Sequence, residues 1–550
     1  MLEKLRIGIL IDDFEVPAWT YQMLLRVYEI ETSEIVLLVK NKAFQKKEEG
    51  KNINFPFSQH YFYSLYKKFD RKYFRSSPDA FEPREVNFLS DIPVIEVEPK
   101  QEDGCQHFDK IAVDTIKKYK IDLFVKLGFK ELKGDILKVS RFGIWSYHHG
   151  NIKYNRGEPP GFWEVFEKRD EVGSTLQMIT ENDNRKILFR SSSLTDKISV
   201  ERNLNNSYWK AASFIPRKIN DLARLGATEF LLRVEKLNQH PDFYFREIKS
   251  IPSNKESLVN LIKFKWGRFK NVIRAFFYRD QWLILYHLDP SGKISTDLSQ
   301  FKKIVPPKDR FWADPHIAEE NNKYYIFIEE LIYGENKGFI SVLEMDPQGN
   351  YSDPVSVLKE NYHLSFPFII KDNGNFYMIP ESKENKRIQL YKSVDFPYKW
   401  QLEKVLMDNV RAVDTVIIPL DNKYWMFTNI VENEGASPND ELFLFWSDNL
   451  VSDNWIGHPE NPIVSDVKSA RMAGSLFYHN GNLYRPSQNC SKHYGYGIQL
   501  NQVLEINETS YQEKTVDSVY PEWDKKVKST HSLSYTGNLT VIDAAYTRKK

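Results

Sequence analysis

Short unbroken apolar runs alternate with helix-like spacing through the first part of the chain. The apolar runs are 6–11, 35–39 and 121–125. Continuous hydrophobic stretches of this length are typical of parallel strands that are covered on both faces. Between the first two runs, Tyr21, Leu24 and Tyr28 recur at helical spacing. This β-α-β opening predicts a doubly wound parallel sheet with its functional residues at the carboxyl ends of the strands.

A further strand-like run ends abruptly in two adjacent histidines. The apolar residues Ile144 and Trp145 lead to His148 and His149, and a polar loop containing Arg156 follows. A strand that carries imidazole groups at its C-terminal end is a common way for an open α/β sheet to build an active site. The sequence leaves open the alternative that these histidines are packed and structurally satisfied.

The middle of the chain has weaker patterns. The basic, aromatic stretch 41–84 is interpreted as a solvated loop, because acids balance its charge and no nucleic-acid module is recognisable. We expect a helix over 209–222 that is broken or kinked at Pro216. Residues 229–242 are expected to be irregular, and 253–266 is expected to be a helical linker.

The second half of the chain repeats. Four segments share an apolar strand, an Asn/Gly-type turn and a Tyr-rich strand, and they begin at Trp312, Phe366, Val413 and Met472. Their spacing of about 50 residues lies in the range of propeller blades. A fifth blade would combine 536–542 with strands from 272–288. The repeat therefore predicts a five-bladed β-propeller.

Together these patterns predict a multidomain α/β plus all-β chain. The expected parts are an α/β domain at 1–215, a helical or irregular linker at 216–265 and the propeller at 266–550. A net charge of +1 argues against a nucleic-acid partner. Cys105 and Cys490 make no disulfide framework, and neither a signal peptide nor an apolar run of about 18 residues is recognisable. We therefore expect a cytoplasmic protein without a transmembrane segment.

The first half resembles the formyltransferase family, which includes methionyl-tRNA and nucleotide-amino-sugar N-formyltransferases. The resemblance covers about 1–215 and is carried by 121–125, 143–149, Arg156-Gly157, Trp163 and 173–175. It implies a Rossmann-like fold and N10-formyltetrahydrofolate as a cofactor. In that family an Asn-x-His pair and an Asp polarise the formyl carbonyl and move protons while an amine attacks.

Matched onto this chain, the histidine is His148, the Asn position is Ser146 and the Asp position is Asn184. Serine offers a shorter donor than asparagine, and Asn184 cannot hold an imidazolium by charge. Asp183 is the neighbouring acid that could replace it, and His149 is the alternative base. Arg156 is expected to contact the substrate.

In the second half, the strands that line a propeller funnel determine its chemistry. The expected substrate-binding residues are Asp314, Glu381, Asp414, Arg471 and Arg485, and no metal site is expected. Paired carboxylates that face a funnel can serve glycoside hydrolysis.

This half resembles the N-terminal propeller of plant glucosamine inositolphosphorylceramide transferases through its Trp-Ala-Asp-Pro, Phe-Pro-Phe and Tyr-Arg-Pro-Ser-Gln-Asn-Cys sequences. It is distantly similar to arabinanase- and xylosidase-type glycosidases. That likeness makes Asp314 a base and Asp414 a pKa-tuning acid. Where those glycosidases carry their general acid Glu, in blade four, this chain has Arg471 to Gly474.

Three hypotheses follow for the function. In the first, the N-terminal domain transfers a formyl or small acyl group to an amino sugar, nucleotide- or lipid-linked, in glycoconjugate or surface-polysaccharide biosynthesis, while the propeller binds the saccharide. In the second, the propeller belongs to a glycosidase or accompanies a glycosyltransferase, and the front domain is degenerate. In the third, the chain binds glycans without catalysis.

Overall fold

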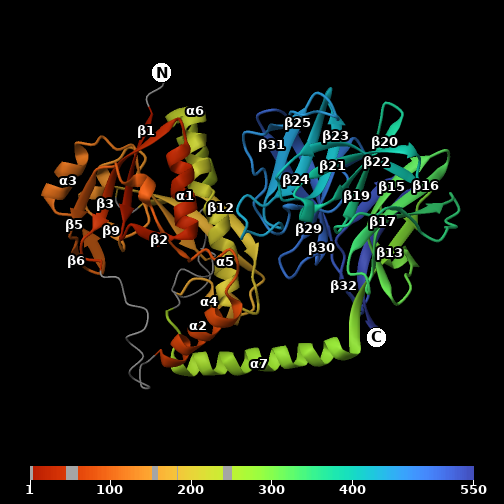
Figure 1. The fold of residues 1–550 in the computed structure, drawn as a ribbon, viewed down its shortest axis with the longest axis horizontal. Helices are drawn as coiled ribbons and strands as arrows, with labels where there is room; N and C mark the ends of the chain where they lie inside the picture. Colours follow the sequence, from red (N-terminus) through yellow and green to blue (C-terminus); the bar gives the residue numbers. More distant parts are fainter. Residues whose placement is uncertain (1–3, 45–59, 151–158, 182–183, 240–249) are drawn as a thin grey trace. The chain divides into compact units, whose positions relative to one another are not determined.

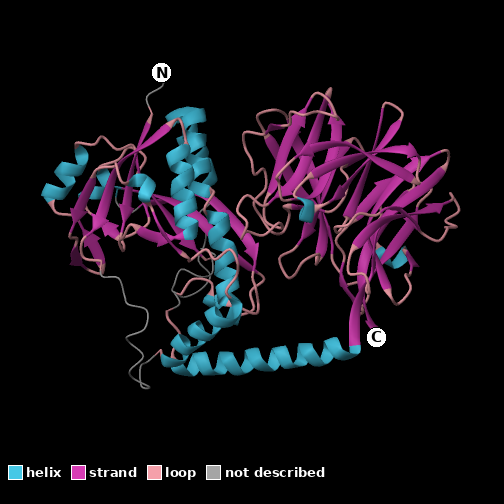
Figure 2. Ribbon diagram, in the orientation of Figure 1, coloured by secondary structure: helices cyan, strands magenta, loops and turns pink. Residues whose placement is uncertain are grey.

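The computed structural model describes residues 4–44, 60–150, 159–181, 184–239 and 250–550 (Figures 1 and 2). The chain forms two compact units. The first comprises Met1–Phe264 with Glu432–Ala436, and the second comprises Lys265–Val431 with Ser437–Lys550. Within the described ranges, no helix combines the length and the apolar character that crossing a membrane requires.

The first unit is built on a seven-stranded sheet with the order β12-β11-β10-β8-β1-β3-β5. Its strands are β1 (Leu5–Ile11), β3 (Ser33–Asn41), β5 (Val94–Val97), β8 (Leu123–Lys126), β10 (Ile144–His149), β11 (Glu171–Thr180) and β12 (Asn184–Leu194). The five strands from β5 to β10 are parallel, as expected. The sheet as a whole is mixed, because β11 and β12 add antiparallel strands at the β10 edge.

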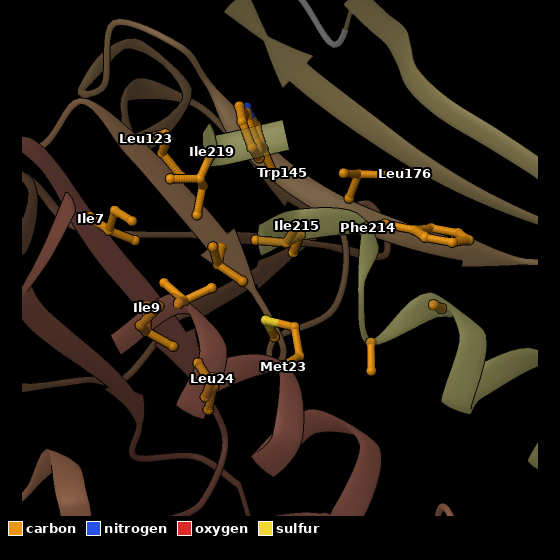
Figure 3. Close-up of a cluster of buried hydrophobic side chains, with 14 of the residues drawn as sticks. Ile7, Ile9, Met23, Leu24, Leu123, Trp145, Leu176, Phe214, Ile215 and Ile219 are labelled. Carbon is orange, nitrogen blue, oxygen red and sulfur yellow. The ribbon is translucent and has the colours of Figure 1, made fainter. Parts of the chain in front are cut away.

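Helices cover both faces of this sheet. On one face, Met23 and Leu24 of α1 (Ala18–Glu29) and Ile215 of α6 (Phe214–Leu237) pack with Ile9 and Trp145 of the strands (Figure 3). On the other face, a second core forms beneath α3 (Lys110–Lys117) and η2 (Asp135–Lys138). The apolar runs therefore became strands covered on both sides. The smaller elements are β2 (Glu15–Pro17), β4 (Pro83–Glu85), η1 (Asn87–Leu89), β6 (Lys100–Glu102), β7 (Cys105–His107), β9 (Leu132–Lys133), α4 (Phe162–Phe166) and α5 (Val200–Ala211).

Several expectations for the connecting segments were wrong. Part of the supposed loop 41–84 is the helix α2 (Tyr61–Phe74), which buries Tyr66 against Phe162. The break near Pro216 falls between α5 and α6. Pro216 itself lies in the first turn of α6, where its missing N–H costs no intrahelical bond.

The helices around the predicted linker are also longer than expected. Residues 229–234 belong to α6, whose non-helical residue is Gly226 at φ 72°. The linker helix α7 (Asn254–Phe277) runs eleven residues beyond Trp266, so 272–277 is helical and not part of a strand. Helical spacing was present in both stretches, but their high polarity obscured it.

The second unit contains five antiparallel sheets, and every residue from Tyr278 onward is described. Three sheets are β15 (Arg310–Glu320) to β18 (Val355–Leu358), β19 (Ser365–Asp372) to β22 (Lys399–Met407), and β23 (Ala412–Leu420) to β26 (Ile456–Gly457). The fourth runs from β27 (Arg471–Met472) to β31 (Tyr511–Val519). The fifth contains β13 (Tyr278–Leu288), β14 (Lys302–Ile304), β32 (Val527–Ser529), β33 (Leu533–Thr536) and β34 (Leu539–Lys549). Within the first four sheets the intervening strands are β16 (Lys323–Ile332), β17 (Gly338–Met345), β20 (Asn375–Glu381), β21 (Ile388–Asp395), β24 (Lys423–Ile430), β25 (Leu442–Ser447), β28 (Phe477–His479), β29 (Asn482–Asn489) and β30 (Gly497–Ile506).

These sheets form a closed ring. Neighbouring sheets share apolar cores, and the fifth sheet packs against the fourth through Leu533 and Ala473. The fifth sheet is made from both ends of the unit, because β13 pairs with β34 from Tyr278↔Lys549 to Leu288↔Leu539. This is the arrangement of a five-bladed β-propeller, as the repeat predicted.

The hairpin turns of the repeat have the backbone geometry that their residues favour. Asn373 and Gly374 both have positive φ, at 46° and 78°, and so do Asn480 and Gly481, at 50° and 76°. Two successive positive φ angles define the tight turn that matches the twist of the flanking strands, and Asn-Gly tolerates them best.

Candidate functional site in the propeller

A β-bulge interrupts the first strand of three blades at the same place. The register shifts between Ala313 and His316 in β15, and equivalent shifts occur in β19 and β23. At these bulges Asp314, Phe366 and Asp414 adopt the left-handed conformation, with φ of 50°, 42° and 50°. Residues other than glycine hold this conformation only when their surroundings enforce it, and such strain gathers at functional sites.

Asp314 belongs to a buried cluster with His531 and Asp543. His531 lies between the two acids, with Nδ1 2.6 Å from Asp543 Oδ2 and Nε2 3.4 Å from Asp314 Oδ1. The hydroxyl of Ser532 donates to Asp314 Oδ1 at 2.7 Å, and the N–H of Asp314 donates to Asp543 Oδ2 at 3.1 Å. Trp282 stacks on the imidazole with a centroid separation of 4.1 Å. The histidine is therefore fixed from both edges and from one face.

The environment shifts the pKa values of this cluster. Burial raises the pKa of Asp314 to about 7; Glu329 adds to this effect and His531 opposes it. Burial alone would lower the pKa of His531, but the carboxylates of Asp543 and Asp314 raise it to about 9. At neutral pH the imidazole is thus protonated, while Asp314 can accept or release a proton.

A second buried cluster surrounds Arg471. Its guanidinium binds Asp414 through Nε and Nη2 at 2.7 and 3.3 Å, and Nη2 lies 3.4 Å from Glu381 Oε2. Nη1 donates to Asn439 Oδ1 at 2.8 Å. Gln488 Nε2 donates at 3.0 Å to Asp414 Oδ2, the oxygen that also accepts from Arg471 Nε. Arginine matches a carboxylate with two parallel donors, so this pair also fixes the orientation of Asp414.

Tyr494 connects the two clusters. Its ring lies 4.8 Å from the Arg471 guanidinium and 5.3 Å from the His531 ring. Burial raises its pKa well above the usual range, and Asp314, Asp414 and Glu381 all contribute to this effect through their charge. Burial, reinforced by Asp414 and opposed by Arg471, also holds the pKa of Glu381 well above its ordinary value. The two clusters therefore form one electrostatically coupled site, in which burial favours the neutral form of Glu381.

Four of the five expected propeller residues meet in this site, namely Asp314, Glu381, Asp414 and Arg471. Arg485 does not join them. It is fully buried inside the fourth blade, where it binds Glu513 at 2.5 and 2.7 Å and the carbonyl of Ser469 at 2.7 Å. Its position at the end of a second strand made it look like a funnel residue, but an ion pair within the blade uses its donors.

Sequence reasoning missed His531, Asp543 and Tyr494. Asp543 carried a signal, since it is the acid inside the apolar run Val541-Ile542-Asp543-Ala544-Ala545. An acid in the middle of a buried strand needs a partner, and His531 is that partner. Tyr494 follows β29 in a loop, where no periodic pattern points to it.

Asp314, His531 and Asp543 also have the ligand types and spacing that could hold a metal ion, because one ligand atom of each lies within 4.8 Å of the others. Hydrogen bonds already use the oxygens of Asp543. The backbone N–H groups of His531 and Ser532 donate to Asp543 Oδ1 at 2.9 and 3.0 Å. The cluster is thus an acid–imidazole–acid arrangement in which His531 Nδ1 lies at ion-pair distance from Asp543.

In the first unit, the two histidines of β10 lie on opposite faces of the sheet. His149 stacks on Tyr208 with a centroid separation of 3.6 Å. The rings of Trp19 and Tyr147 each lie 5.6 Å from the imidazole, and they lie 5.3 Å from each other. Neither ring nitrogen of His149 has a hydrogen-bond partner among the described residues, and burial lowers its pKa to about 3. His149 is a neutral packing residue here, which does not suit it to act as a base.

His148 lies on the other face with Ser146, and both are half-buried. Ser146 pairs in register with Lys126 at the carboxyl end of β8. Burial lowers the pKa of this half-buried lysine. A polar edge therefore forms from His148, Ser146 and Lys126, next to the place where the parallel strand order reverses between β1 and β8.

Asn184, a further expected residue of this domain, has its backbone away from that edge. Asn184 begins β12 opposite Thr180, whereas His148 lies opposite Thr175. Five positions along β11 correspond to roughly 17 Å at about 3.4 Å per residue. Asp183 and Arg156 lie outside the described residues.

The comparisons with known proteins concern mainly the propeller. Residues 300–540 match the family model for the N-terminal part of glucosamine inositolphosphorylceramide transferase 1. The protein of that name from Oryza sativa subsp. japonica is 32% identical over 228 residues, which is 41% of this chain and 30% of the rice protein. The Arabidopsis thaliana protein is 33% identical over 209 residues, which is 38% of this chain and 27% of that protein.

This chain thus aligns with less than a third of the length of these plant relatives. Among solved structures, the GH43 protein BlXynB of Bacillus licheniformis is similar, with a TM-score of 0.29, 17% identity, and coverage of 38% of this chain and 46% of that one. The chain is therefore similar, over its propeller, to a transferase of glycoconjugate biosynthesis.

Proposed function

We propose that the propeller binds the saccharide part of a glycan or glycolipid in a glycosyl-transfer reaction. The observation that carries this proposal is the coupled site of Asp314, Glu381, Asp414 and Arg471, which lies within the residues that match the transferase family model. Burial favours the neutral form of Glu381, which donates a hydrogen bond to a sugar hydroxyl, and Asp314 accepts one, while Arg471 fixes the orientation of Asp414.

Binding of a saccharide explains this arrangement better than hydrolysis does. A glycosidase needs an acid and a base on opposite sides of the glycosidic bond. In the fourth blade the corresponding place is Arg471, whose donors are taken by Asp414, Glu381 and Asn439. We therefore place the chain beside a glycosyltransferase reaction and not among the glycosidases.

Titration calorimetry of the full chain with glucosamine, N-acetylglucosamine and inositol tests the proposal. Asp314→Ala and Glu381→Ala should each weaken sugar binding about 10- to 100-fold, because each removes the side-chain group that hydrogen-bonds to the sugar. Asp408→Ala, which removes an exposed acid paired with Arg387, is the matched control and should bind like the wild type. Unchanged sugar affinity in both site variants would rule the proposal out, and release of free sugar from an aryl glycoside would favour hydrolysis.

A second candidate, acyl transfer in the first unit, is favoured by the polar edge of His148, Ser146 and Lys126. In this proposal His148 accepts the proton of an attacking sugar amine, and Ser146 and Lys126 donate to the oxygen of the acyl group. N10-formyltetrahydrofolate would supply the formyl group. Equilibrium dialysis with folinic acid tests it: binding that is lost in His148→Ala and kept in His149→Phe supports it, and absence of binding to the wild type removes it.

A further inference from the structure

The propeller has a basic pocket away from the acidic site. A cavity of about 140 Å³ is lined by Arg279, Gln281, Lys308, Arg548, Lys549 and Lys550. These residues come from the start of β13, the end of β34 and the loop before β15, all within the second unit. Five of the six lining residues are cations and none is an acid.

No acidic side chain lines the pocket to compensate its cations. Arg279 and Arg548 lie directly opposite in the β13–β34 register, where like charges destabilise a sheet. In the part of the chain that the structure describes, none of the five cations forms an ion pair. The nearby acids are paired with other arginines. Asp309 binds Arg310 through two hydrogen bonds of 3.0 Å, and Asp280 binds Arg274 at 2.7 Å.

Both arginines of the pocket nevertheless contact neighbouring side chains. The guanidinium of Arg279 lies over the ring of Tyr333, 4.0 Å from its centroid. Arg548 donates to the side chain of Gln281, whose amide in turn donates to the carbonyl of Pro307 at 2.7 Å. These contacts position the two arginine side chains beside each other. A preorganised cluster of this kind suits an anion with several acceptor oxygens.

We propose that this pocket binds a phosphate ester. The pocket has space for a group of the size of a phosphate between its cations. Arginine and lysine side chains bind phosphate oxygens through short charge-assisted hydrogen bonds. The phosphate would replace the missing counter-charge between Arg279 and Arg548.

Exposed apolar residues lie beside the pocket, and they help to distinguish a lipid headgroup from a soluble phosphate ester. Phe276 and Phe277, at the end of α7 just before β13, are 74% and 57% exposed, and Ile273 is 45% exposed (Figure 1). The backbone carbonyl of Phe277 accepts the N–H of Lys550, so these residues lie beside the pocket. Aromatic side chains beside a basic site are typical of contacts with anionic lipid headgroups. A soluble phosphate ester, such as a nucleotide-linked sugar, has the same recognised group.

The full chain should be titrated with inorganic pyrophosphate by calorimetry and floated with phosphatidylcholine vesicles, with and without phosphatidylinositol. We expect saturable pyrophosphate binding that Arg548→Gln and Lys308→Gln each weaken about 10- to 100-fold. Lys293→Gln is the matched control, because it removes an exposed lysine from the loop at the other end of β13 and should leave binding unchanged.

A second measurement separates lost binding from lost folding. Pyrophosphate should raise the melting temperature of the wild-type propeller through linkage and raise that of Arg548→Gln by less at the same concentration, while the unliganded Arg548→Gln should melt at the same temperature or higher. Flotation that depends on phosphatidylinositol assigns the site to a lipid headgroup; pyrophosphate binding without flotation assigns it to a soluble phosphate ester. No saturable pyrophosphate binding together with no flotation, or an equal loss in Lys293→Gln, overturns the proposal. Sugar binding at Asp314 and Glu381 is measured separately, so failure of one proposal is distinct from failure of the other.

Discussion

Two regions of this molecule place ionisable side chains at the ends of strands, and they treat them in opposite ways. In the propeller, every charge in the acidic site has a partner on another blade or strand, as Arg471 and His531 illustrate. At the edge of the first unit, His149 is buried among aromatic rings, and neither of its nitrogens has a partner among the described residues.

The difference shows how burial alone and burial with a partner act on the same side chain. Burial of its ring lowers the pKa of His149 to about 3, whereas two flanking carboxylates raise the pKa of the buried His531 to about 9. The first histidine is neutral and the second is charged at neutral pH. A histidine at the end of a strand therefore indicates chemistry only when its neighbours are known.

The largest effect is expected when a partner is removed from the propeller site. Arg471→Met leaves Asp414 buried without its cation, which should cost about 3–5 kcal/mol of unfolding free energy. Urea unfolding of the propeller measures this cost. The matched control is Arg387→Met, which breaks a pair with Asp408 whose side chains are 43% and 66% exposed, and should cost far less because solvent screens this pair. Equal costs for the two variants would contradict the comparison.

His531→Gln should change how stability depends on pH. Because the folded pKa of about 9 lies above the unfolded value of 6.5, the contribution of His531 is complete below pH 6.5 and is lost as the pH rises through 9. We expect the wild-type propeller to lose on the order of 3 kcal/mol across this window, and His531→Gln to be less stable at pH 7 and nearly flat above it. Melting curves at closely spaced pH values measure this. A wild type whose stability does not fall between pH 7 and 9.5 would refute the charged imidazole.

Residues of the propeller site could be predicted from the sequence where they lie in a repeated segment. Asp314 and Asp414 could be assigned to the funnel because both occupy the same position in a repeated segment, which the structure shows to be the bulge. His531 was not predicted as a site residue, because the fifth blade is assembled from both ends of the unit and its strand β33 is only four residues long. The repeat had no copy there to align with.

In the first unit the parallel strands were predictable, but the roles of the two histidines were not assigned. Strand alternation contained the answer: Trp145 and Tyr147 share a face with His149, and the polar Ser146 shares a face with His148. The partners of Arg485 and His149 could not be predicted, because Glu513 and Tyr208 come from distant segments with no pattern connecting them. Pairing across a fold is the information that periodicity does not carry.

A smaller effect is expected for His149→Phe. At neutral pH the phenyl ring should add about 1–3 kcal/mol of stability to the first unit, because it fills similar space and removes two buried unpartnered nitrogens. The folded pKa of His149 lies below the unfolded value, so wild-type stability should fall as the pH drops below 6.5, by about 2 kcal/mol at pH 5. Urea unfolding of the first unit at pH 7 and pH 5 measures both effects. The same acid loss in His149→Phe would show that another group causes it.

The smallest effect is expected for Lys126→Met, which separates packing from function at the polar edge. Lys126 is half-buried and makes no hydrogen bond or ion pair among the described residues, so methionine should raise stability by up to about 1 kcal/mol. If this edge also binds an acyl donor, the gain in stability should be accompanied by weaker binding of folinic acid, because a site residue sacrifices stability for function. Lys130→Met, in the loop after β8, is the control and should change neither quantity. A loss of stability in Lys126→Met would show that the ammonium group has a structural partner, and the first unit would then resemble the propeller more closely than its histidine suggests.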